Sequence, residues 1–134
     1  MDFRNVNAEL HTLLQADPGL RDALDSIRRG EETKVAGLKG SSKALFLAAL
    51  HALTRRTVAV LCAGPDEARS LAQDAAFFVG NGGVLLMPPW DLMLPDTLSP
   101  QRDVERERIR VLSALVEKTP SLVFIPRAAL LQKV

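Results

Sequence analysis

The sequence predicts an α/β fold, a mainly parallel sheet covered by helices, and three observations support this class. Short apolar runs alternate with helical patterns along most of the chain. The strand candidates are continuously apolar, as in TVAVLCA at 57–63, and such runs are typical of strands buried on both faces. Helices between consecutive strands provide the right-handed crossovers that a parallel sheet requires.

Composition places the chain among globular proteins and excludes several classes of function. The chain has 134 residues, 47% of them hydrophobic and 25% charged, which suits one domain with a single core. A formal net charge of +1 gives no general attraction to nucleic acid or to anionic membranes. No Cys/His cluster has metal-ligand spacing, and the single cysteine, Cys62, is expected in the core. With neither a signal peptide nor an apolar run of about 18 residues, the chain is predicted to be cytoplasmic and not membrane-bound.

The first 30 residues are predicted to form a helical segment ahead of the α/β domain. Leucines repeat at helical spacing over 6–15 and 18–29, and DPGL separates the two predicted helices. Two arginines and a glycine end the second helix, where cations and glycine are favoured. The predicted organisation is a helical segment over 1–30 and an α/β domain over 31–134.

The elements of the α/β domain alternate in a regular order. Strands are predicted over 33–38, 57–63, 83–88 and 121–126. Helices are predicted over 42–53, 64–79 and 99–118, and a last helix begins at 127. Four prolines exclude regular structure from 88–100. Because the sequence stops just inside the last helix, we expect a piece of a larger α/β module.

The segment GLKGSSKA at 37–44 has the layout of a phosphate-binding P-loop but departs from it at two positions. A P-loop follows G-x-x-x-x-G-K-[ST], and its backbone N–H groups and the next helix N-terminus cradle the phosphates. Gly37 and Lys43 match the first glycine and the lysine. Ser42 replaces the second glycine, and its Cβ would crowd the backbone around a phosphate. Ala44 replaces the hydroxyl that binds Mg²⁺, so the segment predicts a degenerate P-loop, in shape but not in chemistry.

A working site also needs an acidic residue at the end of a neighbouring strand to complete the Mg²⁺ site. The strands over 57–63 and 121–126 run into glycine-proline and arginine instead. The sequence therefore predicts no catalytic residue, no metal site and no cofactor. The remaining candidate is a weak anion site at the start of the 42–53 helix, formed by Gly37, Gly40, Ser41, Ser42 and Lys43. The alternative is that these are only the turn and cap residues of a generic α/β domain.

Four segments, in order, resemble the N-terminal UvrB-like region of the bacterial transcription-repair coupling factors, the Mfd family. They are GLKGSSKALFLAAL, VAVLCAGPDEARSLAQDAAFF, LLMPPWDLMLPDTLSPQRDVERERIRVLSAL and LVFIPRAALLQK. The most specific element is the loop with Trp90 and Asp91, followed as in the family by an arginine before an apolar residue, Arg108-Ile109. The family usually has an aromatic residue near LPYD, whereas this sequence has Leu94-Pro95-Asp96 and no tyrosine.

This resemblance implies a non-catalytic N-terminal module of a large ATP-dependent DNA translocase. The parent protein would bind ATP and Mg²⁺ in a motor outside this chain, act on double-stranded DNA, displace stalled RNA polymerase and recruit UvrA. The module itself would dock on the rest of its own UvrB-like region. The alternative is an active P-loop ATPase fragment of a UvrB-like DNA repair protein, with its Mg²⁺ acid supplied from beyond residue 134.

Three residues are candidates for contact with a protein partner: Trp90, Asp91 and Arg108. Tryptophan is enriched at the energetic centres of interfaces, but Trp90 equally suits packing of its proline-rich loop onto the sheet. Asp91 equally suits a turn or cap. Arg108 lies in DVERERIR, where alternating charges favour a solvated helix face with ion pairs over a nucleic-acid contact.

Overall fold

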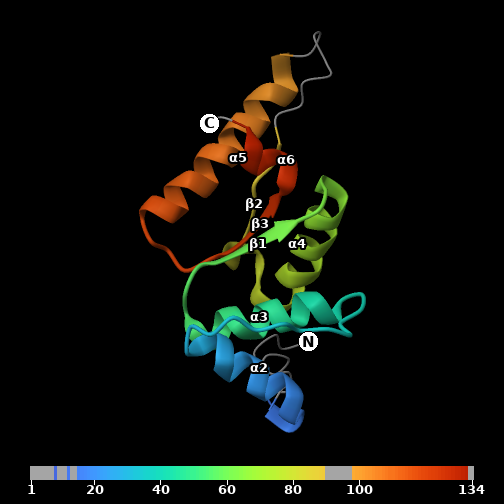
Figure 1. Ribbon diagram of the computed structural model, residues 1–134. Helices are drawn as coiled ribbons and strands as arrows, with labels where there is room; N and C mark the ends of the chain where they lie inside the picture. The colour runs from blue at the N-terminus through green and yellow to red at the C-terminus, as the bar shows by residue number, and fades with distance from the viewer. Residues whose placement is uncertain (1–7, 9–11, 13–14, 90–97, 133–134) are drawn as a thin grey trace.

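The computed structural model describes residues 8, 12, 15–89 and 98–132 (Figure 1). Along the chain its elements are α2 (Pro18–Arg28), α3 (Ser42–Thr54), β1 (Val58–Cys62), α4 (Pro65–Val79), the 3-10 turn η1 (Asn81–Gly83), β2 (Val84–Leu86), α5 (Leu98–Val116), β3 (Leu122–Pro126) and α6 (Arg127–Leu131). The predicted helix over 6–15 lies largely outside the described residues. The remaining helices and three of the four strands are confirmed.

The sheet is parallel throughout, which confirms the predicted fold class. Its strands are ordered β1-β3-β2, with β3 in the centre. Val58 of β1 and Val84 of β2 both pair with Leu122 of β3. The central strand is buried on both faces, as its continuous apolar run predicts, and Leu122, Val123 and Phe124 have no exposed surface.

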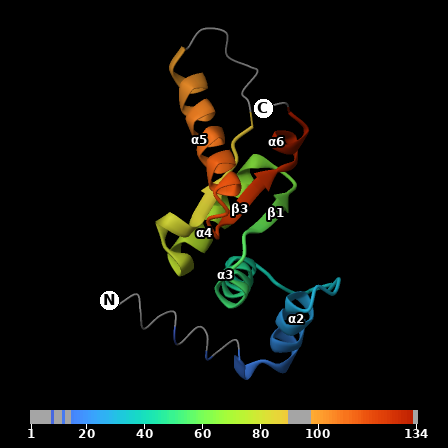
Figure 2. The ribbon, with the colours of Figure 1, turned by 90° about the vertical axis from the view of Figure 1, so that its left-hand side faces the viewer.

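Helices cover both faces of the sheet. Leu122 and Phe124 pack in one cluster with small residues of α3 and α4, among them Ala44, Ala68 and Ala75. Val123, which points to the opposite face because strand side chains alternate, packs in another cluster with residues of α5 and α6. The arrangement is a three-layer one, with α3 and α4 on one face and α5 and α6 on the other (Figure 2).

The helix α2 lies on α3 rather than on the sheet (Figure 1). The Asp17 carboxylate caps its N-terminus, accepting hydrogen bonds from the N–H groups of Gly19 at 2.9 Å and Leu20 at 3.3 Å. Leu24 packs in a cluster with Phe46, Ala49 and Leu50 of α3. A third, smaller core therefore joins the N-terminal helix to the α/β layers.

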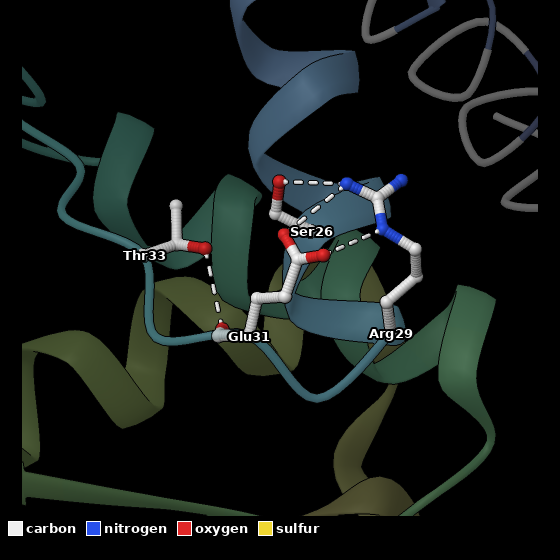
Figure 3. Close-up of polar contacts among 4 residues, drawn as sticks. All are labelled: Ser26, Arg29, Glu31 and Thr33. Atoms are coloured by element: carbon white, nitrogen blue, oxygen red, sulfur yellow. Dashed lines mark hydrogen bonds and ion pairs between the residues drawn. The ribbon is translucent and has the colours of Figure 1, made fainter.

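An exposed network shapes the chain where it leaves α2 (Figure 3). The Arg29 guanidinium donates to both carboxylate oxygens of Glu31, at 3.0 and 3.2 Å, and to the Ser26 hydroxyl at 3.3 Å. The Thr33 hydroxyl donates to the Glu31 carbonyl at 3.3 Å. The hydrogen bond with Glu31 raises the pKa of Arg29, and the same bond lowers the pKa of Glu31. These bonds direct the chain from α2 toward the 37–43 segment.

The strand predicted over 33–38 is not formed. The segment pairs with no strand among the described residues, and Val35 and Leu38 pack instead against the α2–α3 cluster. Gly37 takes a φ of +86°, which interrupts the extended conformation just where a strand would end. The apolar side chains of Val35 and Leu38 are therefore packed against helices, and the segment is not part of the sheet.

Candidate functional site

The 37–43 loop leads into α3, whose first turn packs against α4 and the sheet. Ala44, at the start of α3, shares a core cluster with Cys62, the last residue of β1. Figure 1 shows α3 below the sheet, whereas β1 points upward, away from this helix. Ligands of parallel α/β sheets bind outside the carboxyl ends of the strands.

The backbone of the loop turns at two glycines. Gly37 has a φ of +86° and Gly40 a φ of +56°, left-handed values that glycine adopts without steric cost. Ser41 precedes α3 but makes no side-chain capping hydrogen bond. Lys43 is exposed in the first turn of the helix.

Ser42 closes the loop on itself. Its hydroxyl accepts a hydrogen bond from the Lys39 N–H at 2.8 Å and donates to the Lys39 carbonyl. The Ser42 N–H also donates to that carbonyl, at 3.2 Å. In a working P-loop the loop N–H groups are directed at phosphate oxygens. Here the N–H groups of residues 39 and 42 are already used within the loop.

Ala44 is a core residue. Its side chain is fully buried in the cluster formed by α3, α4 and the sheet. The Mg²⁺-binding hydroxyl of a P-loop belongs at this position, but a hydroxyl on the buried Ala44 Cβ would face apolar neighbours without a clear partner. The alanine that departs from the P-loop pattern at position 44 is therefore a residue that packs in the core.

The carboxyl ends of β1 and β3 carry no arranged carboxylates. Glu67 turns back to accept the Ala63 N–H at 2.9 Å, which ties the end of β1 to the first turn of α4. Asp66 is exposed and pairs with Arg69 at 3.6 Å. Over the described ranges, no three His, Cys, Asp or Glu side chains are grouped so that they would hold a metal ion. Both acids that follow β1 thus make local contacts at the start of α4.

Arg108 occupies a different place from the solvated helix face that the charge pattern favoured. Only 3% of the residue is exposed, and its Nη1 donates to the Pro88 carbonyl at 2.8 Å. The bond joins α5 to the segment that follows β2. Its neighbours do follow the expected pattern, since Arg110 forms an exposed pair with Glu107 at 3.9 Å. Direct contact of Arg108 with a partner stays a prediction.

The structure does not bring the two groups of candidate residues together. Pro88 follows β2, at the edge of the sheet where the parallel strands end. The 37–43 loop belongs to the α3 face, however, and Arg108 to the α5 face. Trp90 and Asp91 lie outside the described residues.

A groove between α2 and α3 was not anticipated from the sequence. Its volume is about 210 Å³, and its lining residues are Gln15, Arg21, Leu24, Asp25, Arg28, Ala49 and Leu53. Arg21 and Arg28 are seven residues apart and so fall on one helix face beside Leu24, which is the signal that was available. The groove has an apolar floor and a charged rim.

Comparison with known proteins identifies the family. The chain is 35% identical over 113 residues to the transcription-repair-coupling factor of Myxococcus xanthus, an alignment that covers 78% of this chain and 9% of that protein. The chain belongs to the family of transcription-repair-coupling factors. The factor of Bacillus subtilis (strain 168) is 21% identical over 122 residues, covering 90% of this chain and 10% of that relative. No family model and no solved structure matches the chain.

The chain thus spans about a tenth of the length of the two transcription-repair-coupling factors it matches. Likeness of the matched segment to UvrB stays a prediction. Across the part of the chain that is described, no helix is long and apolar enough to cross a membrane.

Proposed function

We propose that the chain is a non-catalytic module of a DNA repair protein that couples transcription to nucleotide-excision repair. The absence of catalysis is proposed because Ala44 is buried and because the Ser42 hydroxyl accepts a hydrogen bond from the Lys39 N–H within the loop. The similarity to transcription-repair-coupling factors supports the repair setting.

In this proposal the chain is the N-terminal, UvrB-like part of a longer ATP-dependent DNA translocase. The motor, with its ATP and Mg²⁺, belongs to the other nine-tenths of a protein as long as the relatives. The whole protein acts on double-stranded DNA, displaces stalled RNA polymerase and recruits UvrA. The module docks on the remainder of its own UvrB-like region.

Three features of the loop oppose nucleotide hydrolysis. The hydroxyl ligand for Mg²⁺ is missing, since position 44 is an alanine that faces the core. The Lys39 N–H is occupied by the Ser42 side chain. Of the first two acids after β1, Asp66 pairs with Arg69 and Glu67 accepts the Ala63 N–H. Lys39 and Lys43 provide positive charge but no means of positioning a metal-bound phosphate.

Calorimetric titration with Mg²⁺ and ATP tests the proposal. We expect no binding heat and no ATP hydrolysis from the chain. A Lys43→Ala variant should likewise show neither binding heat nor hydrolysis. A Ser42→Gly/Ala44→Ser variant restores the two missing P-loop residues with the smallest hydroxyl side chain at the buried position. Micromolar binding by the unmodified chain, about −8 kcal/mol, that is lost in Lys43→Ala would contradict the proposal. That result would favour the active ATPase alternative.

A further inference from the structure

We draw no further inference here: the strongest candidate, the exposed surface patch on α5 where Arg102, Arg106 and Arg110 lie about one helical turn apart, carries none because nothing in the structure shows what covers it.

Discussion

At the scale of single residues, Ala44 stands where the P-loop pattern has a hydroxyl, and the structure gives it a packing role. It is fully buried against α4 and the sheet. Ala44→Thr adds a branched, polar side chain to this site, and we expect a loss of about 1–3 kcal/mol in the free energy of unfolding. Urea denaturation measures this free energy for the unmodified chain and the variant. Ala52→Thr, on the exposed side of the same helix, should cost at most about 0.7 kcal/mol. Equal losses would show that position 44 is not a packing site.

The thiol of Cys62 makes stability depend on pH. Burial, and then the charge of Glu67, raise the pKa of Cys62 above its ordinary 9.0. Above pH 9 the unfolded chain therefore gives up this proton before the folded chain does, so the free energy of unfolding falls as the pH rises. The stability difference between the unmodified chain and Cys62→Ala should narrow from about pH 8 to about pH 10. A constant difference across that range would exclude the thiol as its source.

At the scale of elements, Arg108 connects α5 to the end of β2. Its buried guanidinium donates to the Pro88 carbonyl. Arg108→Met keeps the length of the stem but removes this charged donor, and we expect a loss of about 1.5–3 kcal/mol of unfolding free energy. Arg106→Met, exposed on the same helix, should change it by less than about 0.5 kcal/mol. Both values come from urea denaturation, and similar losses would contradict an anchoring role.

The elements also show what the sequence can and cannot predict. Continuous apolar runs correctly identify β1 and β3, although only β3 is buried on both faces, and Ala59 and Leu61 of β1 are exposed. The sequence at 33–38 also predicts a strand. Its conformation depends on its neighbours in space, however, and Val35 packs on helices instead of pairing in the sheet. Likewise the pattern at 42–44 predicts lost P-loop ligands, whereas the Ser42–Lys39 bond and the burial of Ala44 follow only from three-dimensional packing. The inward direction of Arg108 has no signal in an alternating run of charges.

At the scale of the whole molecule, α3 links two of the three small cores. One side of this helix packs against α4 and the sheet, and another packs against α2. Val58 contributes to both of these clusters. Residues 1–30 and 31–134 were predicted as separate segments, a division that only an experiment on the truncated chain can test. The packing of Leu24 against Phe46 and its neighbours argues for mutual stabilisation.

Truncation to residues 31–134 measures this dependence. Without α2, the side chains of Phe46, Ala49 and Leu50 lose their cover, so the free energy of unfolding should fall and a dye specific for apolar surface should bind. Leu24→Ala keeps the helix and isolates the contact, with an expected loss of about 2–5 kcal/mol. Asp22→Ala, exposed on the same helix, is the matched control and should change little. An unchanged urea midpoint after truncation would mean that the α/β layers fold alone. Destabilisation by both changes would instead make α2 part of the same cooperative unit as the sheet.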